Sequence, residues 1–215
     1  LDPPRAPRRA DHAVTAAPAP KLEVGVDVPW VSSWSAEQLT GVAPCPSVDG
    51  ALAVGQAEHP GEGEPLYARN HLFRQRKSVR EMRCPMCGEQ TPEGDRWTQT
   101  ARWTTAGEVR AKGLGVWLPP EFADDRRLLD AGAIAPLHRA CAERALALCP
   151  HLQGLGDHQL KPFPGAWIVV ALSVEAKPSH ALSNVPQRAV AAVTFLQLIG
   201  VPEQYGLNIT TRLGN

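Results

Sequence analysis

The stretch Cys84-Pro85-Met86-Cys87-Gly88 decides the fold that we expect for this chain of 215 residues. Two thiolates three positions apart can reach one cation when the chain between them makes a tight turn, and Gly88 permits the positive φ that such turns often need. A redox-active dithiol is the alternative interpretation. That motif normally belongs to a βαβ unit, whereas turn and strand signals follow here. The stretch therefore predicts one half of a metal site.

The other half is predicted in Pro136-Leu137-His138-Arg139-Ala140-Cys141, at the start of a helix expected over 136–149. His138 and Cys141 lie three positions apart, so at about 100° per residue their side chains are about 60° apart on one helix face. With Cys84 and Cys87 they make a Cys₃His set, which binds Zn²⁺ tetrahedrally and leaves no position open. A knuckle, a strand and a helix whose first turn supplies two ligands make up the treble-clef arrangement, in which the zinc is structural.

The remaining cysteines do not fit this site. Cys149 follows Cys141 by eight residues, which is about 12 Å along an intact helix and too far for a shared ion. It is expected to be a small buried apolar residue. Cys45, in a Pro-Cys-Pro loop, is expected to be a stray thiol. Five cysteines that include a Cys-x-x-Cys pair favour a reduced, intracellular protein, expected in the cytoplasm, over a disulfide framework.

Charge and composition bound the classes of function. Lys plus Arg and Asp plus Glu both number 22, so no global field attracts nucleic acid or an anionic membrane. No run of about 18 apolar residues is present, and no membrane-spanning helix is therefore expected. The 21 prolines and 18 glycines predict a loop-rich α+β protein with short strands and two or three helices. The oligomeric state stays open.

Three regions are expected: a disordered Pro/Ala/Arg-rich arm over 1–21, a zinc-binding domain over 22–160 and a C-terminal strand–helix extension over 161–215. The expected strands are 24–29, 51–54, 96–105, 116–118 and 166–173. The expected helices are 35–39, 119–130 with Gly132 as its cap, 136–149, and 184–199 with Asn184 as its N-cap. The segment 66–82 fits neither period, and most of 41–65 is expected to be loop.

A basic run before the knuckle is the candidate nucleic-acid surface. Between residues 64 and 83 the net charge is +4. Its basic residues are Arg69, Arg74, Arg76, Lys77, Arg80 and Arg83, which could neutralise phosphates. Trp97 and Trp103, expected on one face of the strand 96–105, could stack on bases. A solvated basic face and core tryptophans are the alternative interpretation, and a protein partner is as plausible a ligand as nucleic acid.

Several strings resemble small uncharacterised zinc-binding proteins of actinobacteria and their phages. They are Trp34-Ser35-Ala36-Glu37, Cys84-Pro85-Met86-Cys87-Gly88, Arg126 to Gly132, Pro136 to Ala142 and Cys149-Pro150-His151-Leu152. The resemblance covers about residues 28–152 and implies metal ligands at Cys84, Cys87, His138 and Cys141. It implies no biochemical activity, and the segment 162–215 lies outside it.

Enzymes are the alternative class. The sequence contains no Gly-x-x-x-x-Gly-Lys-Ser/Thr phosphate loop, no His-Glu-x-x-His and no Gly-x-Ser-x-Gly. A nuclease or other hydrolase would need a second metal, for which His151, Asp157 and His158 are the candidates, or a three-thiolate site left open without His138. The sequence therefore predicts a zinc-stabilised binding module for nucleic acid or protein, with a metal-dependent hydrolase as the alternative.

Overall fold

The structure is a computed structural model that describes residues 22–154, 159–177 and 189–202. It is a mixed α+β fold, as the sequence predicts. The expected arm over 1–21 lies outside the described residues.

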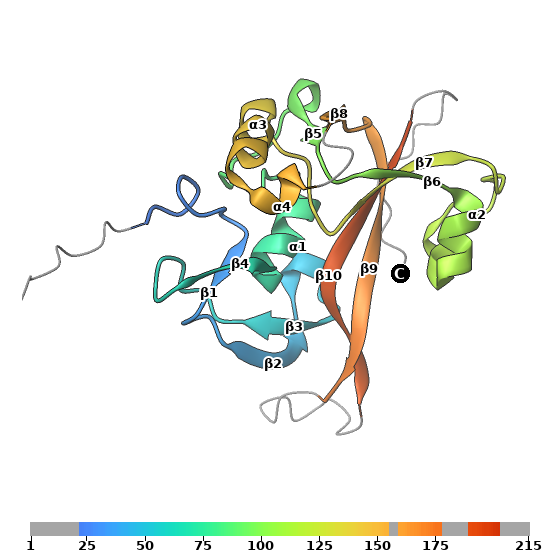
Figure 1. Ribbon diagram of the computed structural model, residues 1–215. Helices are drawn as coiled ribbons and strands as arrows, with labels where there is room; N and C mark the ends of the chain where they lie inside the picture. Colours follow the sequence, from blue (N-terminus) through green and yellow to red (C-terminus); the bar gives the residue numbers. More distant parts are fainter. Residues whose placement is uncertain (1–21, 155–158, 178–188, 203–215) are drawn as a thin grey trace, which may run out of the picture.

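A long antiparallel hairpin forms the centre of the molecule (Figure 1). Its strands are β9 (Ala166–Ala176) and β10 (Val190–Val201). Val169 and Leu198 face one hydrophobic cluster, while Ile168 and Ile199 face a second cluster on the opposite side. Successive strand residues point to opposite faces, so a strand buried on both faces needs an uninterrupted apolar run.

The main sheet has the order β2-β3-β10-β7-β6, and β9 lies on the other edge of β10. The bounds are β2 Leu39–Pro44, β3 Leu52–Gln56, β6 Arg102–Thr105 and β7 Arg127–Gly132. β3 runs parallel to β10 and meets it at Val193, whereas β7 is antiparallel and pairs with Leu198 to Gly200. β3 and β7 therefore share one edge of β10, and within the described structure the residues of β10 between their pairing positions have no neighbouring strand on that edge.

Helix α1 (Leu72–Arg80) covers this part of the edge with polar side chains. Gln75 donates to the Leu196 carbonyl (2.7 Å) and accepts from the Leu196 amide (3.0 Å). Arg76 donates to the carbonyls of Val54 (3.1 Å) and Thr194 (2.8 Å). Buried backbone groups need hydrogen-bond partners. Gln75 and Arg76 provide such partners to Leu196 and Thr194 of β10, as a neighbouring strand would.

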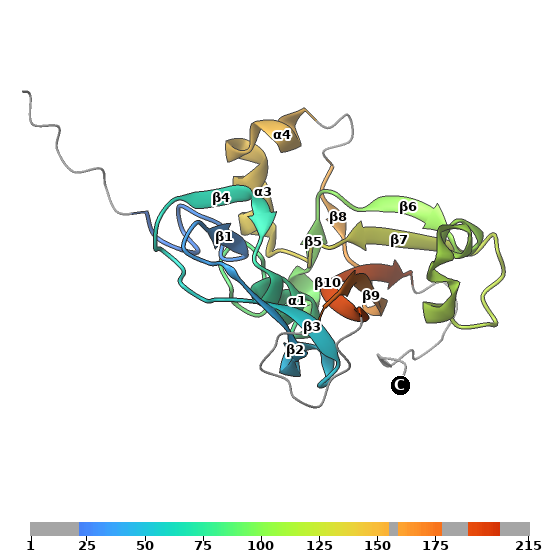
Figure 2. The same cartoon turned by 90° about the horizontal axis from the view of Figure 1, so that it is seen from below.

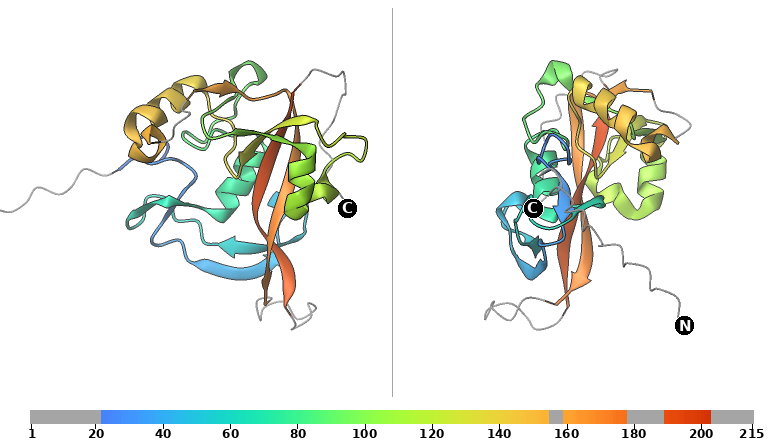
Figure 3. Two further views of the ribbon diagram at one scale, coloured as in Figure 1. Left: turned by 45° about the vertical axis from the view of Figure 1, so that its right-hand side comes forward. Right: turned by 60° about the vertical axis from the view of Figure 1, so that its left-hand side comes forward.

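The described residues also contain two two-stranded sheets and three further α-helices. The strands are β1 Ser32–Trp34 with β4 Pro65–Asn70, and β5 Trp97–Thr98 with β8 Lys161–Pro162. The helices are α2 Ala106–Val109, α3 Arg139–Leu148 and α4 Pro150–Gln153. α1 and α2 lie on opposite sides of the central hairpin (Figures 2 and 3), which matches the two clusters.

Several predicted elements are confirmed. The strand 166–173 is the first part of β9, the strand 51–54 corresponds to β3, and the helix 136–149 contains α3. The ambiguous segment 66–82 holds both kinds of structure, because β4 ends at Asn70 and α1 begins at Leu72. The expected loop 41–65 also contains most of β2.

Two predicted helices are wrong for the same reason. The segment 119–130 leads into strand β7, and the described part of 184–199 belongs to strand β10; Asn184 lies outside the described residues. Leu128 and Leu129, next to each other in β7, are buried in different clusters. Burial on both faces removes the alternation that would have identified a strand. Gly132 ends β7 rather than a helix.

Other local predictions are also wrong. Residues 35–36 form a turn after β1 rather than the start of a helix, and 116–118 belong mostly to a 3₁₀ helix, Gly115–Trp117. The expected strand 24–29 is a turn closed by a single bridge between Val24 and Val28. The expected strand 96–105 is two short strands, β5 and β6, that belong to different sheets.

The segment 161–215 contributes the central strand of the main sheet. β10 pairs with β3 and β7, which both belong to the segment 22–160. The predicted boundary at residue 160 therefore separates strands that share one sheet and one core.

Candidate metal centre

Cys84, Cys87, His138 and Cys141 come together in one cluster. Their ligand atoms all lie within 4.8 Å of one another. The Nδ1 atom of His138 is 3.4 Å from the Cys87 sulfur and 4.0 Å from the Cys141 sulfur. A tetrahedral zinc site with metal–sulfur bonds of about 2.3 Å has edges of about 3.7 Å, so a small inward shift of these side chains would hold one ion.

The knuckle that carries Cys84 and Cys87 is a tight turn closed by backbone hydrogen bonds. The Gly88 amide donates to the Cys84 carbonyl (2.8 Å), and the Cys84 amide donates to the Glu89 carbonyl (2.8 Å). Gly88 has a φ of 82°, and a Cβ there would lie 2.8 Å from the Trp30 ring. The glycine therefore meets two demands, a left-handed backbone and close contact with an aromatic ring.

Residues 30 and 31 are hydrogen-bonded to the knuckle. The amides of Trp30 and Val31 donate to the carbonyls of Met86 (2.8 Å) and Pro85 (3.0 Å). These bonds engage the two residues between the paired thiols. The position of both thiols is therefore fixed by a segment more than fifty residues upstream.

Helix α3 is held in place at its first turn. Leu137 exchanges two backbone hydrogen bonds with Trp97 (2.8 and 2.9 Å), and the Asp95 carboxylate accepts from the Arg139 amide (2.8 Å). A carboxylate at a helix N-terminus satisfies a free amide and complements the helix dipole. His138 and Cys141 are thus presented from an anchored helix start.

The hydrogen bond on the other side of the His138 ring favours ligation through Nδ1. Nε2 lies 3.1 Å from the Gln90 carbonyl, which can only accept, so Nε2 carries the proton. Nδ1 then has its lone pair directed toward the thiols. Metal-bound histidines commonly donate their second N–H to a backbone carbonyl in this way.

Electrostatics in the cluster call for a cation. Burial, and then the neighbouring Cys84 and Cys87 sulfurs, raise the pKa of Cys141 to about 12. Burial also raises the pKa of Cys84, although backbone amides of Cys87, His138 and Met86 donate to its sulfur. Three thiolates repel one another when no cation is present, and a divalent ion removes that repulsion.

The surroundings of the cluster are apolar. Cys84 is fully buried beside Leu137 and Ala142, while the other three ligand side chains are half-buried. Trp97 and Ile134 pack against the same small cluster. An ion here would sit among apolar side chains with all four positions taken by protein.

The basic run does not form a surface patch. Arg74 and Arg76, two of the predicted nucleic-acid residues, are buried, and this part of the prediction is wrong. Arg74 forms a bidentate ion pair with Glu37 (2.6 and 2.8 Å) and also donates to the Ser32 carbonyl. Helix α1 packs against β3 and β10, where Arg76 donates to a carbonyl of each strand, so Arg74 and Arg76 point inward.

The other basic residues are accessible to different degrees. Arg80 is paired with Asp49 and Arg83 with Glu81, each at a shortest distance of 2.5 Å. Lys77 is half-buried, and Arg69 is exposed on β4. Carboxylates therefore neutralise two of these four charges, those of Arg80 and Arg83.

The two tryptophans have different surroundings. Trp97 packs against the apolar cluster of Cys84, Leu137 and Ala142, with the Arg139 guanidinium 4.9 Å from its ring centroid. Trp103 is 49% exposed on β6, with the Arg127 guanidinium 4.6 Å from its ring centroid. They do not share a strand face, and only Trp103 is free to stack on a ligand.

A buried polar network was not recognised in the sequence. Glu37 accepts hydrogen bonds from Arg74 and from the amides of Trp34 (2.8 Å) and His59 (3.1 Å). His71 caps α1 by accepting from the Arg74 amide and contacts the Ala57 carbonyl (3.0 Å). In the sequence, Glu37 occupies an acidic first-turn position of the helix expected over 35–39. Its role as the buried partner of Arg74 depends on a tertiary contact.

The other candidate ligands stay apart from the cluster. Cys149 is half-buried at the junction of α3 and α4, and His151 is exposed on α4. Asp157 and His158 lie outside the described residues. Cys45 is half-buried at the end of β2. Among the residues that the structure describes, no second group of metal ligands is present.

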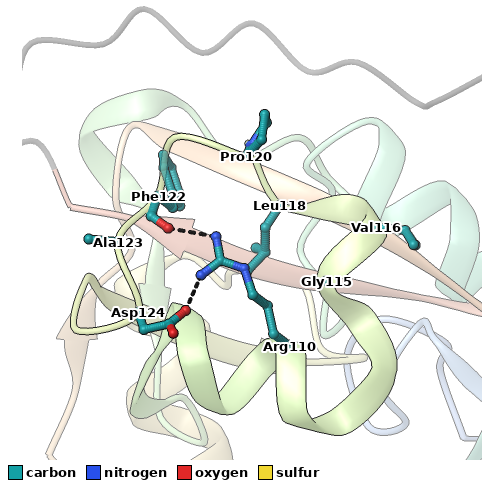
Figure 4. A pocket seen from close by; sticks show the side chains of 8 residues that line it. All are labelled: Arg110, Gly115, Val116, Leu118, Pro120, Phe122, Ala123 and Asp124. Atoms are coloured by element: carbon teal, nitrogen blue, oxygen red, sulfur yellow. Dashed lines mark hydrogen bonds and ion pairs between the residues drawn. The ribbon is translucent and has the colours of Figure 1, made fainter.

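An open pocket lies between the residues that follow α2 and those that precede β7 (Figure 4). It has a volume of about 740 Å³ and is lined by residues 110–124. The Arg110 guanidinium donates to the Asp124 carboxylate and to the Phe122 carbonyl (2.6 Å), so its charge is already satisfied. Val116, at the rim, is 87% exposed.

No known family model, no curated protein and no solved structure matches this chain. No helix in the described part of the chain is long and apolar enough to cross a membrane.

Proposed function

We propose that this protein binds one Zn²⁺ through Cys84, Cys87, His138 and Cys141, and that the ion is structural. The observation that carries the proposal is the convergence of four ligand atoms within 4.8 Å. The donor set of three thiolates and one imidazole is typical of structural zinc, and four protein ligands leave no position for water or substrate. The order of knuckle, short strand and helix also fits a treble-clef-like core.

A structural ion would join the knuckle to the start of α3, two segments that lie far apart in the sequence. The knuckle follows α1, and His138 and Cys141 begin α3 fifty-one residues after Cys87. Closing so long a loop by metal coordination removes much chain entropy from the unfolded state. The ion would thereby stabilise the position of β5 and α3 relative to the sheet.

Native mass spectrometry before and after chelation tests this proposal. We expect one zinc per chain, lost together with the compact charge states, because structural zinc contributes its binding energy to folding. A chain that stays compact after complete removal of the metal would show that the site is not structural. Purified protein that holds a different metal with an exchangeable water would favour the hydrolase alternative.

We propose binding, not catalysis, as the task of the protein. The four-ligand site is closed, and no second ligand cluster is present among the described residues. His151, the described member of the alternative hydrolase site, is exposed, and it belongs to no group of metal ligands among the described residues. The resemblance to actinobacterial and phage zinc proteins remains a prediction that is consistent with this task.

Nucleic acid is the candidate ligand that one surface still favours. Trp103 is stacked by Arg127 and lies beside a pocket of about 440 Å³ that also includes Arg102 and Lys112. Glu108 and Asp130 line the same pocket and partly offset these charges. Aromatic rings next to arginines accept the bases of single strands with little sequence preference.

Fluorescence anisotropy with labelled single-stranded DNA and RNA tests this surface. We expect affinity that falls with salt and falls about tenfold or more in Trp103→Ala, because stacking on one base is worth about 1–3 kcal/mol. Trp97→Phe is the control, because Trp97 packs beside the candidate zinc ligands, and this variant should retain nucleic-acid binding. Equal affinity of wild type and Trp103→Ala, or no binding by either, would leave a protein as the partner class.

A further inference from the structure

The Arg76 side chain is a buried cation for which the structure offers no carboxylate. Only 1% of the residue is exposed. Its guanidinium donates to the hydroxyl of Ser47 (2.9 Å) and to two backbone carbonyls. Among the described residues, no Asp or Glu lies within ion-pair distance of it.

An isolated buried charge is costly, so a counter-ion is expected beside it. The titratable group next to Arg76 is the Cys45 thiol, 3.8 Å from Nη2. Burial lowers the pKa of the Arg76 guanidinium, and the neighbouring Cys45 sulfur offsets only part of that effect. Ionised Cys45 would therefore neutralise the one buried cation in this region of the core that has no carboxylate.

The hydrogen-bond directions around Ser47 support an ionised sulfur. Arg76 Nε–H donates to the Ser47 hydroxyl oxygen, so the hydroxyl hydrogen is free to donate to the Cys45 sulfur at 3.1 Å. The Ser47 amide also donates to that sulfur. The sulfur thus faces three donors, the hydroxyl, the amide and the guanidinium, and each of them stabilises a thiolate more than a thiol.

The balance of these effects lowers the pKa of Cys45. Burial opposes ionisation most strongly, but the hydroxyl and amide of Ser47 and the charge of Arg76 together outweigh it. The residue is half-buried in the turn between β2 and β3, with exposed prolines on both sides. A thiolate that is partly open to solvent is the nucleophilic form of cysteine.

We propose that Cys45 is a thiolate at neutral pH, held by the buried Arg76 guanidinium, and is a site of oxidation by hydroperoxides. In this reaction the sulfur attacks one peroxide oxygen of H₂O₂, an S–O bond forms and the O–O bond breaks. The products are a sulfenic acid and hydroxide, which is neutralised by a proton from the buffer. One small-molecule thiol then condenses with the sulfenic acid to a mixed disulfide and releases water, and a second such thiol reduces this disulfide and restores the cysteine.

The first experiment measures ionisation directly. The ultraviolet absorbance of the thiolate is followed against pH in the wild type and in Cys45→Ala, and the difference reports Cys45 alone. We expect a midpoint below the ordinary thiol value of about 8.5. Ser47→Ala should raise that midpoint, while Arg80→Gln, which removes an ion pair from the same turn, should not. A wild-type midpoint at or above the ordinary value overturns the proposal.

The second experiment measures reactivity, with Cys149 as an internal control. The metal-loaded chain is treated with iodoacetamide at several pH values, or with H₂O₂ followed by a sulfenic-acid probe, and each cysteine is quantified by peptide mass spectrometry. Below its pKa an ordinary thiol slows about tenfold per pH unit, and we expect the rate at Cys45 to change less than about twofold per unit. Parallel pH profiles, or a Cys45 that stays unmodified while Cys149 reacts, would overturn the proposal. Neither result depends on zinc, because both compared thiols lie outside the metal cluster.

Discussion

Two hydrogen bonds join the side chain of Gln75 to the backbone of Leu196. The Gln75 Nε2 atom donates to the Leu196 carbonyl, and the Leu196 backbone amide donates to Gln75 Oε1. The residues are 121 positions apart, and both are fully buried. The side chain of a helix therefore pairs with β10 as a neighbouring strand would, at the point where β3 and β7 leave its edge uncovered.

Replacing this glutamine should destabilise the whole fold. Gln75→Leu keeps the side-chain size but leaves the amide and the carbonyl of Leu196 buried without partners. We expect the free energy of unfolding to fall by about 3 kcal/mol, since each unsatisfied buried group costs about 1–3 kcal/mol. Denaturant unfolding followed by circular dichroism measures this. Gln38→Leu, at an exposed position, is the control and should change the stability little; equal effects would refute the strand-like role of Gln75.

The proposed zinc site predicts a sharp difference between two cysteines near α3. Cys141→Ser should lose the metal and unfold the region around the knuckle, because one thiolate ligand is removed from a closed set. Cys149→Ser, at the end of the same helix, should keep the metal and most of the stability. Metal content and proteolysis of the two variants would show the difference. A folded, metal-loaded Cys141→Ser protein would contradict the assignment.

Gly88 should be irreplaceable although it ligates nothing. Its φ is +82°, and an added Cβ would lie 2.8 Å from the Trp30 ring. We expect Gly88→Ala to cost about 2 kcal/mol through backbone strain alone, with weaker metal retention. Gly94→Ala is the matched control, since a Cβ there meets nothing within 4 Å. Thermal unfolding of the metal-loaded variants compares them, and similar midpoints would show that the knuckle adapts.

Acid should destabilise the protein through the buried network around Glu37. Burial holds the pKa of His71 below 6.5, so its neutral form is the folded one and stability is lost as the pH falls below that unfolded value. The pKa of Glu37 lies below 4.5, because Arg74 and the Trp34 amide outweigh its burial, and its contribution is lost as the pH falls below 4.5. Both effects therefore lower the free energy of unfolding as the pH falls.

A variant separates this effect from release of the metal by acid. His71→Gln cannot take up the proton, so its stability should fall less steeply than that of the wild type just below pH 6.5. His59→Gln, at an exposed position, should follow the wild type. Denaturant unfolding at several pH values, with metal content measured in parallel, tests the comparison. Identical slopes for wild type and His71→Gln would remove His71 as the cause.

The local sequence determined the elements that carry strong local signals. The turn Cys84-Pro85-Met86-Cys87-Gly88 contains a glycine that supplies its positive φ, and α3 starts and ends close to the prolines at 136 and 150. The four ligands of the candidate metal centre followed from their chemistry and spacing. The structure brings all four together. Short-range geometry was sufficient for this part of the protein.

Tertiary packing decided the remainder. The strands β7 and β10 are buried on both faces, so their sequences carry no alternation and resemble buried helices. The arginines of α1 have the composition of a surface patch, but the partners that bury them are distant in sequence: Glu37 for Arg74, and Ser47, Cys45 and Thr194 for Arg76. A charge is stable in a core only beside particular partners, and the sequence alone does not reveal which residues the fold brings together.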